Sequence, residues 1–399
     1  MRVFFRKIKS GFIRLGKGFA ALKFQIKKVC AVVKCLCLSL FSRESRTYIY
    51  KAEEKLNALF PDKGYIIDNA IFKNSASIDL SIIIATCNAE RYIEECLNSV
   101  VNQKTKYNVE IIIVNDGSTD KTAEKIKPYL SDKRVKYYEQ NNQGQSAARN
   151  FAIFNSVGKY LMIVDSDDII ADGSIDFFIG TAINIGSDIV EGKGQMFYNN
   201  IEFTIDKRYR IVKSYSRELL KSVGYSWGKI YKRELWENVS YPVGYIFEDI
   251  ITKFILRRKA NKIATSNAVI YGYRVGIQSS SHKSNNLNFL SSLRVMPKIW
   301  GLCDRNNIPK DKIFYLLSLN HIGLLNYIML KCQPQELQEL AFSVMQNQIK
   351  DISAYKPNNI PLMFKMLEKS IRYGKFKTWQ HISETIIKYK FLKKYREIN

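Results

Sequence analysis

The sequence is poor in the residues that build disulfide frameworks and zinc sites. Its 399 residues include seven cysteines and three histidines. The cysteines are odd in number and scattered, no two of them form a CxxC pair, and no histidine stands beside them. A small disulfide scaffold is therefore excluded and no zinc site is indicated. This cysteine usage fits a reducing cytosol best.

Long apolar runs are also missing. Residues 29–41 are apolar, but this stretch contains Lys34 and is much shorter than the roughly 20 residues that span a bilayer. Basic residues recur through Lys28 and no small-residue cleavage site follows, so a secretory signal is not indicated. Phenylalanine and leucine alternate with Lys and Arg over residues 1–41, which is typical of a helix lying in the plane of lipid headgroups. The alternative is a surface helix that packs on its own domain.

Positive charge is concentrated at the two ends of the chain. The net charge is +25. Residues 1–77 carry 16 Lys/Arg against 5 Asp/Glu, residues 285–399 carry 18 against 8, and residues 78–284 carry 28 against 24. Basic ends favour an anionic membrane surface, at about 1 kcal/mol per basic residue. We therefore expect a peripheral protein on the cytoplasmic face of a membrane, and nucleic acid is the less favoured partner.

Buried strands alternate with amphipathic helices through residues 78–284. Apolar, β-branched runs at residues 80–85, 109–114 and 159–164 are typical of parallel strands that are covered on both faces. The alternation predicts an α/β fold with a mostly parallel sheet flanked by helices. The strand signal ends near residue 285. The sequence thus predicts a basic amphipathic segment (1–77), an α/β domain (78–284) and a basic helical domain (285–399).

Polar residues stand at the carboxyl ends of three predicted strands, where ligands bind in such sheets. They are Thr86, Asp116 and the run Asp165-Ser166-Asp167-Asp168. Neighbouring carboxylates repel one another unless a cation offsets their charge, and hard oxygen ligands select Mg²⁺ or Mn²⁺. The alternative is that the acidic run is a polar loop leading into a helix, and that Asp116 only forms a turn.

In combination, five segments resemble the glycosyltransferase family 2 proteins, whose α/β fold is called GT-A. The segments are SIIIATCNAERYIEECLNSVVNQ, VEIIIVNDGSTDKT, NNQGQSAARNFAIFNSVGKYLMIVDSDDII, WGKIYKRELW and GYIFEDI. They cover roughly residues 78–280, about half of the chain. The resemblance implies a GT-A-like domain that uses a nucleotide-sugar donor.

By this resemblance, the donor site consists of Thr86, Asn88, Asp116, Arg149, Asp165 and Asp167. Asp116 would line the nucleoside pocket and Asp165 would face the ribose. Asp167 closes the DxD motif of the family and would bind the metal, Mn²⁺ or Mg²⁺. A divalent cation stabilises a departing nucleoside diphosphate without a proton donor.

Sugar transfer also requires a base that deprotonates the acceptor hydroxyl. Glu248 and Asp249 precede a predicted helix and are the candidates for this base, and the resemblance favours Asp249. The alternative is that two acids at a helix start only complement its dipole.

Three further residues are candidates for the acceptor site. Trp227 can offer an aromatic face to a sugar, although a buried tryptophan is an equally good interpretation. Arg274 and His282 follow a predicted strand and are candidates for reaching the diphosphate or the acceptor, although a histidine beside serines is often ordinary surface loop.

The sequence departs from the family where Asn115 replaces the first of two consecutive acids, and where Thr-Cys-Asn ends the first strand. No QxxRW signature of processive synthases is present. We therefore expect inverting transfer of a single sugar, from a UDP-sugar to a glycan or lipid-linked acceptor, in cell-surface polysaccharide or lipooligosaccharide synthesis. The alternative is a non-catalytic basic adaptor for membrane or nucleic acid. A sugar nucleotidyltransferase is disfavoured because a Gly-rich phosphate loop is absent near the first strand.

Overall fold

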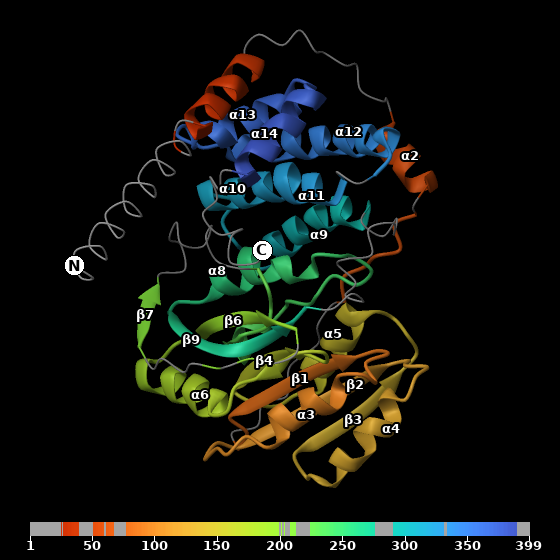
Figure 1. Cartoon of the computed structure of the whole chain (residues 1–399), viewed down its shortest axis with the longest axis vertical. Helices are drawn as coiled ribbons and strands as arrows, with labels where there is room; N and C mark the ends of the chain where they lie inside the picture. Colours follow the sequence, from red (N-terminus) through yellow and green to blue (C-terminus); the bar gives the residue numbers. More distant parts are fainter. Residues whose placement is uncertain are drawn as a thin grey trace, which may run out of the picture. The chain divides into compact units, whose positions relative to one another are not determined.

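The computed structural model describes most of the chain in two compact units (Figure 1). The described residues are 25, 27–39, 51–59, 61–67, 77–198, 201, 203, 208–212, 224–275, 290–330 and 333–388. One unit is Asn57–Leu317, and the other combines Met1–Leu56 with Ser318–Asn399. The division of the chain at residues 78 and 285 stays a prediction.

A mixed sheet forms the core of the Asn57–Leu317 unit, and nine strands of it lie in the described residues. The strand order is β3-β2-β1-β4-β8-β6-β9-β5, and β7 pairs with β9. The strands are β1 (Leu80–Thr86), β2 (Val109–Asp116), β3 (Val135–Gln140), β4 (Tyr160–Asp165), β5 (Ile169–Ile170), β6 (Ile189–Phe197), β7 (Tyr209–Val212), β8 (Lys229–Lys232) and β9 (Ile263–Arg274). Strands β3, β2, β1 and β4 are parallel, and β8 runs antiparallel to β4. The predicted α/β class is confirmed.

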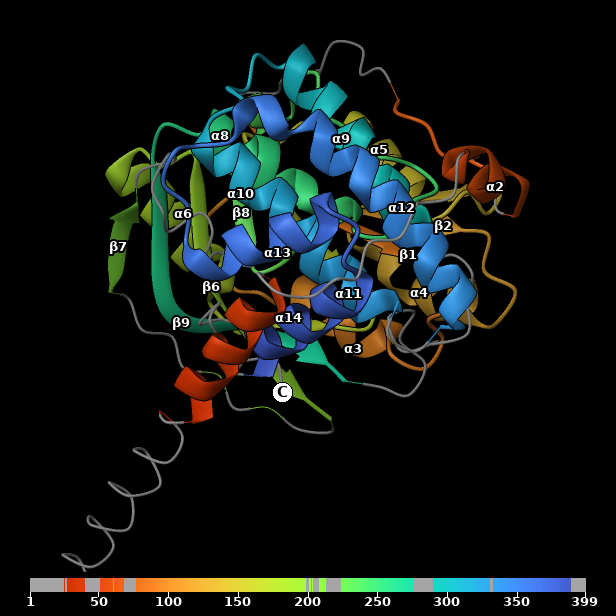
Figure 2. The same ribbon diagram turned by 90° about the horizontal axis from the view of Figure 1, so that it is seen from above.

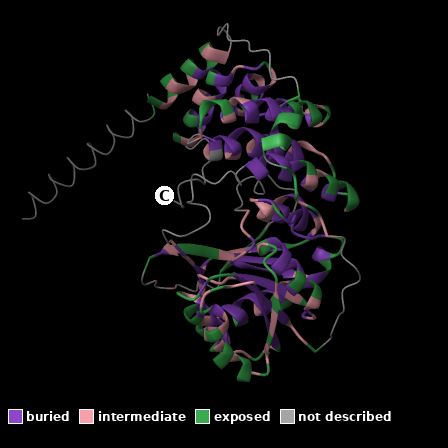
Figure 3. Ribbon diagram, turned by 90° about the vertical axis from the view of Figure 1, so that its right-hand side faces the viewer, coloured by how far each residue is buried: buried purple, intermediate pink, exposed green. Residues whose placement is uncertain are grey.

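Helices cover the parallel half of the sheet on both faces. The helices are α3 (Ile93–Val101), α4 (Thr122–Ile126), η1 (Lys127–Ser131), α5 (Gln145–Asn155) and α6 (Ser174–Ile185). Ile82 and Ile84 of β1 join one core with the apolar residues of α3 and α6, whereas α5 contacts β1 and β2 from the other side. All seven residues of β1 are buried, which explains its nearly continuous apolar sequence. Figure 3 shows these strands buried and the outer faces of the helices exposed.

Shorter elements complete this unit. They are η2 (Arg233–Trp236), η3 (Glu248–Ile250), the π-helix η4 (Thr252–Leu256), α8 (Arg257–Lys259) and α9 (Ser292–Arg305). Helix α2 (Ala52–Leu59) and helix α10 (Lys312–Asn320) each cross a boundary between the units.

The second unit is helical in its described residues, as the loss of strand signal predicts. Its elements are the π-helix η7 (His321–Leu325), α11 (Asn326–Leu330), α12 (Gln335–Asp351), η8 (Ser353–Tyr355), α13 (Leu362–Arg372) and α14 (Phe376–Lys388). Trp379 is fully buried, packs against the tilted rings of Phe342 and Phe376, and donates from Nε1 to the Gly323 carbonyl at 3.0 Å. An aromatic cluster therefore anchors α14.

A helix at residues 27–39 belongs to the same unit (Figure 2). Cys35 is buried, and its thiol donates to Thr385 Oγ1 of α14 at 3.4 Å. On another face of this helix the side chains of Val29 and Val33 are 61% and 52% exposed. Residues 1–24 of the predicted interfacial segment lie outside the described residues. Within the described part of the chain, no helix is both long and apolar enough to cross a membrane.

Candidate functional site

Asp116 at the end of β2 organises the loop that leads into α5. Its Oδ1 atom accepts from Gln140 Nε2 at 2.7 Å and from the Gln143 amide at 2.9 Å, and Oδ2 accepts from the Gly144 amide at 2.8 Å. The carboxylate is 2% exposed. Gly144, with a φ of 90°, is the N-cap residue of α5. Asp116 therefore fixes the start of α5 beside the strand end.

Thr86 and Asn88 lie in the adjacent loop. The register of β1 pairs Thr86 with Asn115 of β2, and Ala85 with Asp165 of β4, so the three strand ends converge as predicted. The Thr86 hydroxyl is buried and has no hydrogen-bond partner among the described residues. Asn88 adopts a left-handed φ of 50° and accepts from the Thr119 amide at 2.8 Å, which ties this loop to the turn after β2.

The acidic run after β4 is a tight turn in which each carboxylate has different surroundings. Asp168 is fully buried and accepts from the Tyr271 hydroxyl and the Arg274 amide, both at 2.7 Å. Arg274 also donates from Nε to the main-chain oxygen of Asp167 at 2.9 Å. Strand β9 thus holds the turn through Asp168 and Arg274, while the partly exposed Asp165 and Asp167 carboxylates face elsewhere.

Asp167 has the properties of a ligand for a hard cation. Among the described residues no side chain hydrogen bonds to its carboxylate, and burial together with the Asp165 charge raises the pKa of Asp167 to about 6. A bound divalent cation would offset both the cost of burying the Asp167 charge and its repulsion by Asp165. Among the described residues there is no cluster of three or more His, Cys, Asp or Glu side chains that could by itself bind a metal ion. A single carboxylate still fits Mg²⁺, which is usually bound by one or two carboxylates plus substrate phosphates.

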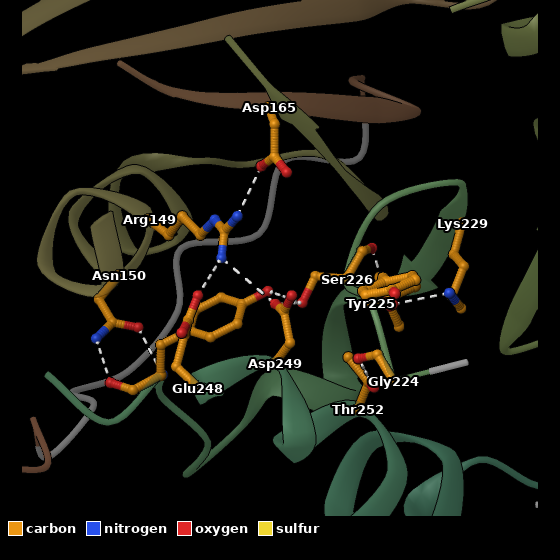
Figure 4. A network of polar contacts seen from close by, with 12 residues as sticks. Arg149, Asn150, Asp165, Gly224, Tyr225, Ser226, Lys229, Glu248, Asp249 and Thr252 are labelled. Atoms are coloured by element: carbon orange, nitrogen blue, oxygen red, sulfur yellow. Dashed lines mark hydrogen bonds and ion pairs between the residues drawn. The ribbon is translucent and has the colours of Figure 1, made fainter. Parts of the chain in front are cut away.

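Arg149 of α5 connects the acidic turn to the two acids at η3 (Figure 4). Its Nη2 atom lies 2.6 Å from Asp165 Oδ1. Its Nη1 atom lies 2.9 Å from Glu248 Oε1 and 3.4 Å from Asp249 Oδ1. The arginine is 2% exposed. One buried cation therefore gathers three carboxylates, as the fork geometry of a guanidinium allows.

The main chain before these acids is strained. Phe247 has a left-handed φ of 65°, a conformation that costs a non-glycine residue about 1 kcal/mol or more. It begins the turn that directs Glu248 and Asp249 toward Arg149 (Figure 4). Because the surrounding contacts hold this strained turn, the positions of the two acids are defined by the fold and not by local preference.

Burial sets the protonation of the two acids. It raises the pKa of Glu248 to about 7, with a further contribution from the Asp249 charge. It also raises the pKa of Asp249, and this rise is opposed by the Arg149 cation and by a hydrogen bond from Ser226. The Asp249 side chain is 24% exposed and that of Glu248 is 13% exposed. Asp249 is thus the more accessible of the two carboxylates, and it also accepts the hydroxyl of Ser226.

The three predicted acceptor residues have different surroundings. Trp227 stacks on Tyr225, with ring centroids 4.7 Å apart, and on Tyr271 at 4.6 Å. Arg274 pairs with Glu95 and lies over the rings of Tyr92 and Phe197. Packing thus accounts for both residues, and their roles toward an acceptor stay predictions.

His282, the third of them, lies outside the described residues.

Two residues of this site were not predicted from the sequence. Ser226 donates to Asp249 Oδ1 at 2.5 Å, and the Tyr241 hydroxyl donates to Ser226 Oγ at 2.6 Å. Ser226 stands directly before Trp227 in the segment WGKIYKRELW, and Tyr241 shortly before GYIFEDI. In the sequence, only this proximity to the two segments indicates that Ser226 and Tyr241 belong to the site.

Comparison with known proteins finds a family match for the region that holds most of the site. Residues 81–246 match the family model described as glycosyl transferase family 2. Glycosyltransferase GlyA of Streptococcus pneumoniae serotype 4 is 32% identical over 212 residues, which are 49% of this chain and 30% of GlyA. Putative glycosyltransferase EpsH of Bacillus subtilis is 35% identical over 162 residues, which are 38% of this chain and 46% of EpsH. The matched regions span less than half the length of either relative.

The fold is also found in solved structures. S. aureus TarS 1–349 in complex with UDP-GlcNAc has a TM-score of 0.64 and 20% sequence identity, over 78% of this chain and 92% of that chain. The complex of the same protein with UDP has a TM-score of 0.60 and 21% identity, with the same coverage. At this identity the likeness shows the fold alone.

Proposed function

From the glycosyl transferase family 2 domain that the family model matches at residues 81–246, we propose that this protein transfers a single sugar from a nucleotide-sugar to an acceptor hydroxyl. The observation that carries the proposal is the cluster of Arg149 with Asp165, Glu248 and Asp249, built at the strand ends where the donor binds in such folds. Such a cluster is difficult to explain as a structural element alone, because it concentrates three carboxylates around one buried cation.

The donor is held on the side of β1, β2 and β4. Thr86, Asn88 and Asp116 line the nucleoside pocket. Support comes from the unsatisfied Thr86 hydroxyl and from the rigid loop that Asp116 fixes. Asp165 faces the ribose, and Arg149, which pairs with Asp165, lies near the donor.

Asp167 would hold the cation, Mn²⁺ or Mg²⁺. The bound cation supplies electrostatic stabilisation of the departing nucleoside diphosphate. The elevated pKa of Asp167 favours this assignment, because burial and the Asp165 charge outweigh the nearby arginines and a bound cation would offset the remaining cost of ionising the carboxylate.

Asp249 acts as the base in a single, inverting displacement. Its carboxylate accepts the proton of the acceptor hydroxyl while the oxygen attacks the anomeric carbon and the bond to the diphosphate breaks. Glu248 sits beside it and, with its pKa near neutrality, shares the Arg149 cation. Trp227, Arg274 and His282 are assigned to the acceptor side.

The proposed donor is a UDP-sugar, and the proposed acceptor is a cell-surface glycan or a lipid-linked glycan. The first is supported by the UDP and UDP-GlcNAc complexes of TarS. The second is supported by the resemblance to the minor teichoic acid biosynthesis protein GgaB of B. subtilis, which is 32% identical over 107 residues, 26% of this chain and 12% of GgaB.

We place the protein on the cytoplasmic face of an anionic membrane, because its excess positive charge lies toward the two ends of the chain. Sedimentation with vesicles of phosphatidylserine and phosphatidylcholine tests this placement. Binding should weaken as salt is raised, because salt screens the charges. Equal binding to neutral vesicles would argue against an electrostatic partner.

The decisive experiment is incubation with a panel of UDP-sugars and Mn²⁺ or Mg²⁺, read out as released UDP. Slow UDP release with at least one donor, lost in the Asp249→Asn variant when an acceptor is present, supports the proposal. No release and no thermal shift with any donor would favour the alternative, a non-catalytic basic adaptor for membrane or nucleic acid.

A further inference from the structure

Two buried hydroxyls form a directed chain that ends on Asp249. The Tyr241 hydroxyl donates to Ser226 Oγ at 2.6 Å, and Ser226 Oγ donates to Asp249 Oδ1 at 2.5 Å. Figure 4 shows Ser226 directed at Asp249 beside the Arg149 contacts. Ser226 has a single hydroxyl proton, which it donates to the carboxylate, so it accepts the proton of the Tyr241 hydroxyl. The direction of the chain is therefore fixed, with the carboxylate as its terminal acceptor.

The hydrogen-bond chain from Tyr241 to Asp249 is held in place by its surroundings, and neither hydroxyl has contact with solvent. Ser226 and Tyr241 are fully buried. Asn150 holds the main chain of Tyr241 from both sides: its Nδ2 donates to the Tyr241 carbonyl and its Oδ1 accepts from the Tyr241 amide, each at 2.8 Å. The Arg149 guanidinium lies over the Tyr241 ring, 5.3 Å from its centroid. Consecutive residues of α5 thus fix the tyrosine and contact the acids.

The hydrogen-bond chain occupies one carboxylate oxygen of Asp249 and leaves the other free to accept a hydrogen bond. Its Oδ1 atom receives the Ser226 hydroxyl and the longer contact from Arg149. Among the described residues nothing hydrogen bonds to Oδ2, and the side chain remains 24% exposed. Because Oδ1 is fixed by these contacts, Oδ2 is presented in one orientation.

We propose that Tyr241 and Ser226 are positioning residues for the base: they hold Asp249 Oδ1 inward so that Oδ2 faces the acceptor hydroxyl, and they stabilise the ionised carboxylate. This inference rests on the proposed function, because it assigns the two hydroxyls to the same site. It extends the site to two residues outside the donor-binding and acidic motifs.

The charge balance around Asp249 determines what the loss of a hydroxyl should do. The groups that act on it are Arg149, Lys229, Glu248 and Asp165, with the phenols of Tyr225, Tyr231 and Tyr241 nearby. Burial raises the pKa of Asp249, and Arg149, Ser226 and Lys229 lower it. Removal of the Ser226 hydroxyl should therefore raise this pKa further, since one stabilising hydrogen bond is lost.

The first test is the pH profile of sugar transfer in Ser226→Ala and Tyr241→Phe. Ser226→Ala should lower kcat roughly tenfold and move the acidic limb upward by about half to one pH unit, the equivalent of one hydrogen bond. The donor KM should change less than about twofold, because the donor side is untouched. Tyr241→Phe should act in the same direction but more weakly.

Tyr231→Phe is the matched control. The Tyr231 hydroxyl is equally buried and donates to the main-chain oxygen of Ser226 at 3.0 Å, so this variant also removes one phenol oxygen next to Ser226. It leaves the chain to Asp249 intact and should retain the wild-type pH profile. A Ser226→Ala protein with unchanged kcat and acidic limb, or a Tyr231→Phe protein with the same shift as Tyr241→Phe, would overturn the proposal.

A second readout does not depend on activity. The ionisation of Asp249 can be followed by NMR in full-length protein with ¹³C-labelled aspartate side chains, with Asp249→Asn identifying the signal. The pKa should rise in Ser226→Ala and stay constant in Tyr231→Phe. If the wild type transfers no sugar, the proposed function fails while this titration still decides the hydrogen-bond chain. An Asp249 signal that titrates identically in Ser226→Ala and the wild type would refute it.

Discussion

The Nη2 atom of Arg149 lies 2.6 Å from Oδ1 of Asp165, so α5 is joined to the end of β4 by a buried ion pair. The other terminal nitrogen of the same guanidinium pairs with Glu248, 99 residues further along the chain. A single planar cation thus connects the donor side of the proposed site to the base side. A replacement of Arg149 that lacks the two terminal nitrogens of a guanidinium should therefore break the connection between the two sides.

Arg149→Lys should therefore be severely damaging although charge is conserved. A lysine ammonium is a compact charge that does not span both acidic groups in the same way. We expect a loss of about 2–4 kcal/mol in the free energy of unfolding, since buried carboxylates lose their partner, and at least a tenfold fall in UDP release. Urea unfolding and the donor panel measure the two effects.

Arg134→Lys is the matched control for this change. Arg134 binds the single carboxylate of Asp132 through Nε and Nη2, and its side chain is 34% exposed. We expect a stability change below about 1 kcal/mol there. Equal effects of the two substitutions would show that the cluster at Arg149 has no special role.

Asp249→Asn should separate catalysis from donor binding. The amide keeps the size of the side chain but cannot accept the acceptor proton, so kcat should fall by about 10²–10⁴ while UDP still shifts the melting temperature. Glu248→Gln serves as the comparison. If Glu248→Gln abolishes transfer and Asp249→Asn does not, the roles of the two acids are reversed.

The local elements of the fold were predictable because their signals are local. The apolar run at residues 80–85 lies in strand β1, and α5 is one of the helices that alternate with the strands as predicted. Both follow from the spacing of apolar residues within one element. The convergence of Thr86, Asp116 and Asp165 followed from the topology of a parallel sheet.

The contacts within the site were less predictable because they join distant segments. Nothing near Arg149 indicates that it pairs with Glu248, and Ser226 is 23 residues away from Asp249. The predicted helical domain contains the π-helix η7 between α10 and α11, which apolar periodicity does not reveal. Tertiary packing decides these features.

Asp167→Ala should abolish the stabilisation that a divalent cation and UDP give together. If Asp167 holds the cation, Mn²⁺ with UDP should raise the melting temperature of the wild type and leave that of the variant unchanged. Asp172→Ala is the control, since Asp172 is an exposed acid a few residues further on. Equal metal-dependent shifts in all three proteins would remove Asp167 from the metal site.

Stability without ligands should fall as the pH rises from about 4.5 to about 7. The unfolded-state pKa values of Asp and Glu are lower than those of folded Asp167, about 6, and folded Glu248, about 7. The folded protein therefore binds more protons than the unfolded chain in this range, and the free energy of unfolding decreases as these protons are lost. We expect a decrease of several kcal/mol, because each unit by which a folded-state pKa is raised corresponds to about 1.4 kcal/mol. Urea unfolding at pH 5 and pH 7.5 measures it. Glu248→Gln should flatten the dependence, since a glutamine does not titrate, and an equally steep decrease in that variant would assign the effect to other acids.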